Sequence, residues 1–172
     1  MKKGDNMARL EKIIEIEVYT DGSCKRIGEL TFGGLAYVIV IDSKMVGCGS
    51  ESYDTTTNQQ MELLAAIKGL EAADKIKKKE DKVVVYSDSA YLTNCYLQNW
   101  YLGWINKGWV NSKGEPVANK ELWMKLIPYF EKYGYSFSKV KGHANSFYNN
   151  MCDEMAQRAA EELKQSWRGK NG

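Results

Sequence analysis

The stretch that decides the fold is VVVYSDS, residues 83–89. Its first four side chains are apolar or aromatic at both odd and even positions, which is typical of a strand covered on both faces. Before it, TNQQ at residues 57–60 fits a capping box and predicts a helix over 57–79. At residues 13–19, IIEIEVY alternates β-branched residues with acids and predicts another strand. A strand, a long helix and a covered strand in this order indicate a parallel crossover.

The rest of the chain adds an antiparallel hairpin and further helices. Strands over 34–41 and 44–51 are separated only by Asp42 and Ser43, which predicts a hairpin. Residues 20–23 (TDGS) are expected to end the first strand in a turn. The other expected elements are helices over 90–130 with a loop at 108–117, a strand over 136–141, a polar loop over 142–148 and a last helix over 149–163. Together they predict one mixed α/β domain.

Length and composition are those of a single globular domain. The chain has 172 residues, of which 44% are hydrophobic and 27% charged. We expect residues 1–12 to form a flexible tail, 13–164 the folded domain and 165–172 a C-terminal tail. No apolar run reaches the roughly 18 residues of a membrane span, and no apolar segment follows the basic start. We therefore expect a cytoplasmic monomer with no membrane partner.

Charge and cysteine content restrict the partners and cofactors. The 24 Lys and Arg residues against 22 Asp and Glu give a net charge of +2, so a polyanion would have to be held by a local patch. The four cysteines lie more than 20 residues apart and are accompanied by one histidine. This spacing favours four reduced thiols over a zinc site or a disulfide framework.

Four acids lie at predicted element boundaries. Asp21 and Asp88 follow strands, whereas Glu62 and Asp153 lie in the first turns of helices. Ligand sites of open α/β sheets collect beyond the carboxyl ends of parallel strands, so these side chains are candidates for one cluster. An Asp-Gly after a strand is, however, usually a turn, and an acid in a first helical turn usually serves the helix dipole. The spacing by itself leaves both interpretations open.

A cluster of this composition suits a hard cation. Carboxylate oxygens are preferred by Mg²⁺ or Mn²⁺, whereas zinc sites generally include Cys or His. Such a site can hold two metal ions about 3.5–4 Å apart, which activate water and stabilise the leaving oxygen in phosphodiester cleavage.

Five sequence blocks carry a family resemblance. They are YTDGSC at 19–24, TTNQQMELLAAI at 56–67, VYSDS at 85–89, VKGHA at 140–144 and NNMCDEMA at 149–156. In this order they resemble ribonuclease H of type 1, the bacterial-style enzyme. The resemblance implies an RNase H-like α/β fold, a five-stranded mixed sheet with helices on both faces. It also implies endonucleolytic hydrolysis of the RNA strand of RNA–DNA hybrids, leaving a 5′-phosphate and a 3′-hydroxyl.

The resemblance also implies roles for individual residues. By position, the metal-binding carboxylates are those of Asp21, Glu62, Asp88 and Asp153, which would hold two Mg²⁺ ions or, alternatively, Mn²⁺. Asp21 would bridge the two ions, and Glu62 would also reach the ribose beside the scissile phosphate. His143 is expected in a flexible loop before the last helix, where the matching histidine assists proton transfer or product release. A solitary loop histidine is usually a solvated side chain, but the Lys-Gly-His-Ala context of His143 favours a functional role.

Substrate contacts follow from the same resemblance. Gly22 (through its backbone), Asn58 and Glu62 would read ribose 2′-hydroxyls, which distinguish RNA from DNA. Thr57 matches a residue that contacts a DNA phosphate; its helix-capping role is a competing explanation, and both can hold at once.

The aromatic residues that follow raise a choice between packing and binding. Tyr96, Trp100 and Trp104 recur at helical spacing, a stripe more often found in a core than in a stacking platform. We choose Trp100 for DNA contact and expect Trp104 and Trp109 to pack inside. The segment at 105–109 resembles the family's basic protrusion, but lysines are few there, and Lys107 is the residue chosen for substrate binding.

Three departures from the family pattern weaken binding assignments. KRIGEL at 25–30 replaces a glycine- and proline-rich turn, so the first hairpin is expected to be built differently. Ala90 stands where a glutamine often touches RNA. Gly103 stands where an asparagine that helps to hold a DNA phosphate is expected, and the protrusion is one residue longer before Trp104.

Two other functions remain to be distinguished. One is a module that binds hybrids or duplexes without cutting them; the intact set of acids argues against it. The other is a junction resolvase or integrase core on the same superfold, because a fold alone does not determine function. His143 and the ribose-reading residues between Asn58 and Glu62 argue against this second alternative.

Overall fold

The computed structural model describes residues 13–140 and 142–172, except for the side chains of residues 142–145. Within these residues the centre of the molecule is a five-stranded sheet of order β3-β2-β1-β4-β5. Its strands are β1 (Glu15–Ile27), β2 (Leu30–Ile41), β3 (Lys44–Asp54), β4 (Lys82–Ser87) and β5 (Ser136–Lys139). The pairs β1–β2 and β2–β3 are antiparallel, and β1–β4 and β4–β5 are parallel. The predicted mixed sheet and its parallel crossover are confirmed.

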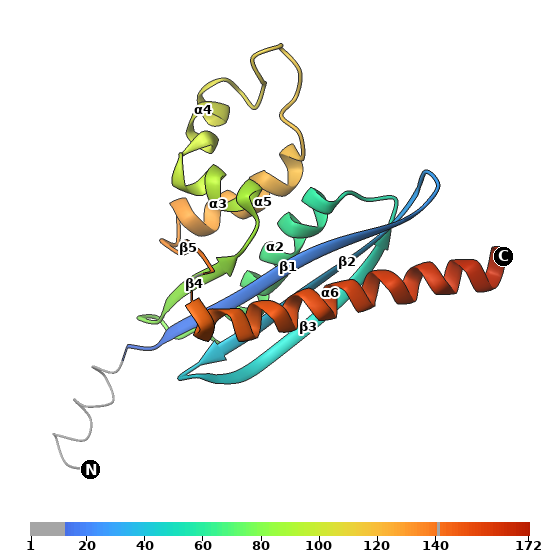
Figure 1. Ribbon diagram of the computed structural model, residues 1–172. Coiled ribbons are helices and arrows are strands. Elements are labelled where there is room, and N and C mark those ends of the chain that lie inside the picture. The colour runs from blue at the N-terminus through green and yellow to red at the C-terminus, as the bar shows by residue number, and fades with distance from the viewer. Residues whose placement is uncertain (1–12, 141) are drawn as a thin grey trace, which may run out of the picture.

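Helices cover both faces of this sheet (Figure 1). They are α2 (Asn58–Ile76), α3 (Ala90–Leu97), α4 (Trp100–Asn106), α5 (Lys120–Glu131) and α6 (Gly142–Asn171). The side chains of β1 alternate between two cores. Ile16 and Val18 belong to the larger core with α2 and α5, whereas Tyr19 belongs to the smaller core with α6. The sheet is thus buried on both sides, as the apolar character of residues 83–86 predicted.

The first hairpin is longer than expected. β1 does not end in a turn at residues 20–23, so that prediction is wrong; the strand pairs with β2 as far as Ile27 and Leu30. Gly22 lies inside the strand, where a Cβ atom would come within 2.5 Å of the backbone nitrogen of Glu62. Glycine is required there because α2 approaches β1 closely, rather than because the chain turns.

The second hairpin confirms its prediction. Asp42 and Ser43 connect β2 to β3 with φ angles of 52° and 64°. Two successive positive φ angles characterise the type I′ turn, whose twist matches that of the flanking strands.

Helix α2 begins as its sequence predicts. The Thr57 hydroxyl accepts a hydrogen bond from the Gln60 backbone N–H, and the Gln60 side chain accepts one from the Thr57 N–H. This capping box fixes the first turn of the helix. The helix ends at Ile76, a few residues before the expected position. On its inner side Gly69 packs against Val18, which a Cβ at this glycine would approach to 2.7 Å.

The last helix differs from its prediction at both ends. α6 begins at Gly142, so the loop expected over 142–148 is wrong, and it continues to Asn171. Residues 165–171, expected in a tail, extend the helix because Trp167 packs against Phe32 of β2 with ring centroids 6.0 Å apart. The long first hairpin thus supplies the surface that holds the additional turns. The tail expected over 1–12 lies outside the described residues.

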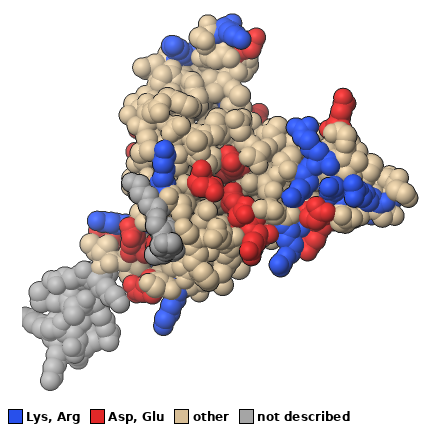
Figure 2. Space-filling view, viewed as in Figure 1, with Lys and Arg blue, Asp and Glu red and all other residues tan. Residues whose placement is uncertain are grey.

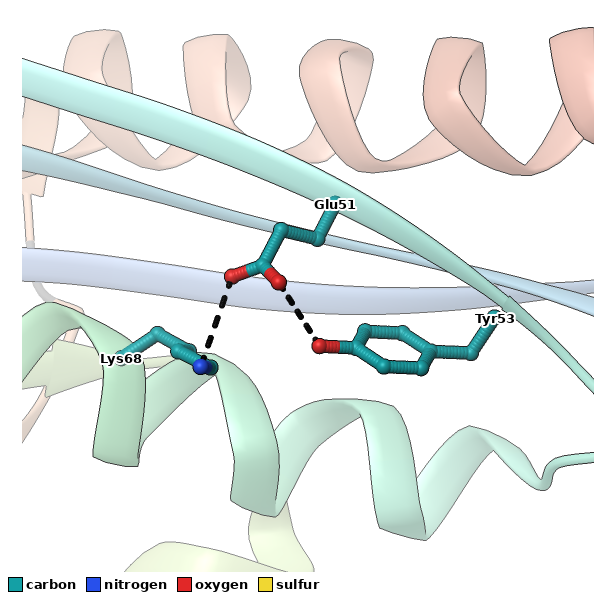
Figure 3. Close-up of polar contacts among 3 residues, drawn as sticks. All are labelled: Glu51, Tyr53 and Lys68. Carbon is teal, nitrogen blue, oxygen red and sulfur yellow. Dashed lines mark hydrogen bonds and ion pairs between the residues drawn. The ribbon is translucent and has the colours of Figure 1, made fainter.

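The exposed edge of the sheet is tied to α2 by polar contacts. Lys68 of α2 lies 3.9 Å from the Glu51 carboxylate of β3, and the Tyr53 hydroxyl donates a 2.7 Å hydrogen bond to the same carboxylate (Figure 3). Burial and this hydrogen bond raise the pKa of Tyr53 to about 12. The ion pair is half exposed, so we expect it to contribute at most about 1 kcal/mol. None of the helices in the described ranges combines the length and apolar composition needed to cross a membrane.

Candidate active site

The four predicted carboxylates come from four different elements. Asp21 lies on β1 two residues beyond Tyr19, where the parallel pairing of β1 with β4 ends. Asp88 directly follows β4, and Glu62 lies in the second turn of α2. Asp153 is well inside α6 rather than in a first helical turn, because this helix begins earlier than predicted. The middle of β1, the carboxyl end of β4 and the two helices therefore bring these acids to one region beyond the point where β1 and β4 stop pairing.

Asp21 is the buried centre of this group, with an exposed fraction of only 8%. Burial, the negative charge of Asp88 and a hydrogen bond with Asp153 together raise the pKa of Asp21 to about 8. The Gly22 backbone N–H donates a 2.9 Å hydrogen bond to Oδ1 of Asp21, which opposes the rise only in part. Asp88 and Asp153 are thus close enough to Asp21 for the three carboxyl groups to interact.

Glu62 is held in place from two sides. The Ser89 hydroxyl donates a 2.6 Å hydrogen bond to Oε2, and the Asn58 side-chain amide donates a 3.1 Å hydrogen bond to Oε1. Burial and the charge of Asp88 raise the pKa of Glu62, whereas the two hydrogen bonds lower it. Glu62 therefore belongs to the same electrostatic group as Asp88.

Two further residues support the carboxylates and had no predicted role. Ser89 caps α3 by accepting a hydrogen bond from the Leu92 N–H, in addition to binding Glu62. Asn149 of α6 is 9% exposed and donates a 3.4 Å hydrogen bond to Asp88. Both residues lie inside blocks that resemble the family. A serine before a helix signals a cap, but nothing local in the sequence indicates that its hydroxyl also reaches Glu62.

Side chains on α6 complete the surroundings of Asp153. Gln157, one turn further along, donates a 2.9 Å hydrogen bond to the Asp153 carboxylate. Next to Asp153, the buried Cys152 thiol lies 3.2 Å from the Tyr19 carbonyl oxygen, its hydrogen-bond acceptor. Burial and the charge of Asp21 raise the pKa of Cys152, so it stays a neutral thiol. Cys152 therefore packs α6 against β1 behind the site.

The donor chemistry of the site fits a hard divalent cation. Among the described residues, no three His, Cys, Asp or Glu side chains are placed to hold one ion together. Burial, together with the charge of Asp88 and the hydrogen bond with Asp153, nevertheless raises the pKa of Asp21 enough to keep a proton on it near neutral pH. Beside them, the buried Oδ1 of Asn149 has no hydrogen-bond partner among the described residues. Excess negative charge and an unpartnered oxygen are features that a bound Mg²⁺ or Mn²⁺ would satisfy.

The predicted ribose and phosphate readers surround Glu62. The Gly22 backbone lies against the start of α2, and the Asn58 side chain is hydrogen-bonded to Glu62 itself. The Thr57 side chain serves as the helix cap, so its structural role is confirmed, and phosphate contact stays a prediction. His143 falls in α6, within the residues whose side chains lie outside the description.

The aromatic residues separate into a packed and an exposed set. Asn99, with φ 55°, interrupts the helix, so Tyr96 and Trp100 do not lie on one continuous helical face as predicted. Trp104 contacts Trp109 and Trp123 and is partly buried, as expected. Trp100 is 40% exposed. It lines a groove of about 350 Å³ together with Lys107, which brings these two predicted substrate-binding residues together.

Acidic and basic side chains gather in different parts of the surface. Figure 2 shows acidic side chains gathered in the middle of one face, and Lys and Arg side chains gathered over the first hairpin and the C-terminal half of α6. The molecule therefore combines an acidic centre with a flanking basic region, although its net charge is only +2.

Sequence comparisons identify the family. The family model described as RNase H matches residues 14–161. A ribonuclease H of Caldicellulosiruptor saccharolyticus is 40% identical over 150 residues, which cover 87% of this chain and 99% of the relative. A ribonuclease H of Syntrophomonas wolfei is 41% identical over 149 residues, covering 87% and 98%.

Solved structures agree on the fold. LC9-RNase H1, a type 1 RNase H with the type 2 active-site motif, matches with a TM-score of 0.67 at 24% identity, over 88% of this chain and 74% of that chain. LC11-RNase H1 in complex with an RNA/DNA hybrid matches with a TM-score of 0.64 at 22% identity, over 86% and 98%. A five-stranded mixed sheet with acids on and beside its inner strands β1 and β4 thus defines an RNase H-like protein. The chain belongs to the ribonuclease H family, which confirms the resemblance found in its motifs.

Proposed function

We propose that this protein is an endoribonuclease that hydrolyses the RNA strand of RNA–DNA hybrids, using two bound Mg²⁺ ions and leaving 5′-phosphate and 3′-hydroxyl ends. The observation that carries the proposal is the interaction of Asp21 with both Asp88 and Asp153, in a chain whose relatives are ribonucleases H. Mn²⁺ would serve as an alternative to Mg²⁺, because both prefer oxygen ligands. Cytoplasmic location and a monomeric state stay predictions.

Four carboxylates would supply the oxygen donors for the metal ions. Asp21, Glu62, Asp88 and Asp153 would hold the metal ions, which when bound supply an activated water and stabilise the leaving oxygen. Asn149 and Gln157 orient Asp88 and Asp153, and Ser89 orients Glu62. Such outer partners fix a ligand's direction before an ion binds, which reduces the reorganisation that binding requires.

Selectivity for the RNA strand of a hybrid would come from the ribose 2′-hydroxyl, which RNA has and DNA lacks. The Gly22 backbone, Asn58 and Glu62 lie together at the start of α2 and would read ribose 2′-hydroxyls. Thr57 at the helix N-terminus would face a phosphate of the DNA strand. Trp100 and Lys107, on their shared groove, would contact the DNA strand through stacking and charge. His143 would assist proton transfer or product release.

Cleavage of matched substrates tests the proposal. The wild-type protein with Mg²⁺ should cut an RNA–DNA hybrid but leave double-stranded RNA, double-stranded DNA and single-stranded RNA intact. Asp21→Asn and Asp88→Asn should each abolish cutting while the circular dichroism spectrum stays that of the wild type. Full activity in either variant would refute the assignment. Hybrid binding without cutting would favour a non-cleaving module, and cutting of a four-way junction would favour a resolvase.

A further inference from the structure

The basic surface over the first hairpin and the end of α6 lies outside the site described above. Its members are Lys25 on β1 and Lys164 and Arg168 on α6, whose charges all act on the Glu161 carboxylate, and we call it the distal basic surface. We propose that the distal basic surface binds the phosphate backbone of the hybrid several base pairs away from the scissile bond. This inference rests on the proposed function, because the hybrid is its ligand.

The geometry of α6 connects this surface to the active site. Asp153, Gln157, Glu161, Lys164 and Arg168 recur every three or four residues and therefore share one side of the helix. This side lies next to the buried side that carries Ala156 and Ala160. The row begins at a proposed metal ligand and ends in two cations, so a duplex lying along it would pass from the acidic centre to the basic end.

The distances suit a nucleic-acid duplex. With a rise of about 1.5 Å per residue, Lys164 lies about 16 Å and Arg168 about 22 Å along the helix axis from Asp153. Successive phosphates of one strand are about 3.4 Å apart along a duplex, so these separations correspond to about five to seven base pairs. The surface would therefore contact a part of the hybrid that the carboxylates and the α2 N-terminus do not reach.

Cations from β1 and from α6 act on the same carboxylate, that of Glu161. A 2.7 Å hydrogen bond from Gln165 lowers the pKa of Glu161, and the charges of Lys164 and Arg168 on α6 and of Lys25 on the hairpin lower it further. The described residues contain a single ion pair, between Lys68 and Glu51, so no cation of the distal basic surface is within 4.0 Å of a carboxylate there. Their charges remain available to phosphates.

The distal basic surface carries more charge than the protrusion that the family resemblance suggested. The distal basic surface has three cations around Glu161, namely Lys25, Lys164 and Arg168, whereas residues 98–119 contain two Lys and one acid. Figure 2 shows Lys and Arg side chains gathered over the first hairpin and the C-terminal half of α6, on the same face as the acidic centre. The packing of Trp167 against Phe32 fixes the end of α6 to the hairpin, so both elements present their cations together.

A charge-matched pair of double variants tests the proposal. Lys164→Gln with Arg168→Gln removes two charges from the surface, and Lys78→Gln with Lys79→Gln removes two exposed lysines beyond the C-terminus of α2, at the opposite end of β1. KM and affinity are measured with hybrids of about 6 and 20 base pairs at several salt concentrations. Affinity is read by fluorescence anisotropy in an Asp88→Asn background, which removes cutting from the measurement.

The expected result depends on substrate length. The Lys164/Arg168 double variant should weaken binding of the long hybrid roughly tenfold at about 0.1 M salt and reduce the slope of log K against log salt by about two, because two phosphate contacts are lost. The short hybrid should be affected much less, and the Lys78/Lys79 variant should resemble the wild type with both. Glu161→Gln should strengthen long-hybrid binding, because it removes a carboxylate from among the cations.

The outcomes separate this proposal from the nuclease assignment. If the wild type cuts hybrids but the two double variants behave alike, or both lengths are weakened equally, the distal basic surface does not bind the hybrid and the nuclease assignment stands. If the wild type cuts no hybrid, the nuclease assignment fails, and a length-dependent loss of binding would still support the surface.

Discussion

Ser89 donates a 2.6 Å hydrogen bond to Glu62, joining the turn after β4 to the second turn of α2. The same hydroxyl accepts a hydrogen bond from the Leu92 N–H at the start of α3. One buried serine therefore sets both the start of a helix and the direction of a proposed metal ligand. This contact spans 27 positions of the chain, and it makes Ser89 a positioning residue for Glu62.

Ser89→Ala should lower kcat by about 10- to 100-fold, because an outer partner of a metal ligand is lost. Loss of the helix cap should also cost about 1 kcal/mol of stability. Ser89→Thr keeps a hydroxyl and should restore most of the activity. Cleavage rates at several Mg²⁺ concentrations, together with thermal melts, separate the two effects. An alanine variant that melts earlier but cuts at the wild-type rate would show that Ser89 is only a cap.

The raised pKa of Asp21 predicts how the metal-free protein responds to pH. The folded state holds this proton up to about pH 8, whereas an unperturbed carboxyl releases it near 3.8. Between these values the folded state binds more protons than the unfolded state, so the contribution of Asp21 to the free energy of unfolding falls as pH rises. It is fully present below about pH 3.8 and is lost as the pH passes about 8.

Asp21→Asn should therefore stabilise the metal-free protein at high pH. In EDTA at pH 8 we expect Tm to rise by about 4 °C or more, which corresponds to about 1–2 kcal/mol for a chain of this length. Near pH 4 the two proteins should melt at similar temperatures, because Asp21 is then neutral in the folded wild type. A variant that is less stable than the wild type at pH 8 would contradict the raised pKa of Asp21 that burial and the neighbouring carboxyl groups produce.

Gly22→Ala should disturb the site through the backbone. A Cβ atom at this position would lie 2.5 Å from the Glu62 backbone nitrogen and from the Met61 carbonyl carbon, so α2 would have to move. We expect a loss of about 1–3 kcal/mol from overpacking, and a loss of activity of about 100-fold because Glu62 moves with the helix. Gly47→Ala on β3, where a Cβ would meet only the Ile39 side chain at an ordinary contact distance of 3.9 Å, is the control and should change neither property appreciably.

Trp100→Ala should weaken substrate binding without destabilising the fold. The side chain is 40% exposed and lies on the groove shared with Lys107. Loss of a stacking aromatic costs about 1–3 kcal/mol per base, so KM for the hybrid should rise by about 5- to 150-fold with little change in Tm. Trp104→Ala should give the reverse pattern, a lower Tm, because its ring packs against Trp109 and Trp123. Equal KM values for wild type and Trp100→Ala would remove Trp100 from the interface.

Local patterns in the sequence predicted local structure well. The capping box at Thr57 and Gln60 placed the start of α2, and Asp42 and Ser43 placed the second hairpin, because both depend on neighbours within a few residues. The same local logic misplaced Gly22 in a turn. A glycine that allows close approach and a glycine that turns the chain look alike in sequence, and only the position of α2 distinguishes them.

By itself, the sequence determined which acids could form a site, that oxygen donors would dominate it, and the order of strands and helices that carries them. Tertiary structure decided the rest: the pKa of Asp21, the hydrogen bonds of Ser89 and Asn149, and the extension of α6 over the first hairpin. The physical reason is the separation along the chain over which each interaction acts. Periodicity and capping act between residues that are neighbours along the chain, whereas burial, charge interaction and ring packing depend on residues that only the folded chain brings together.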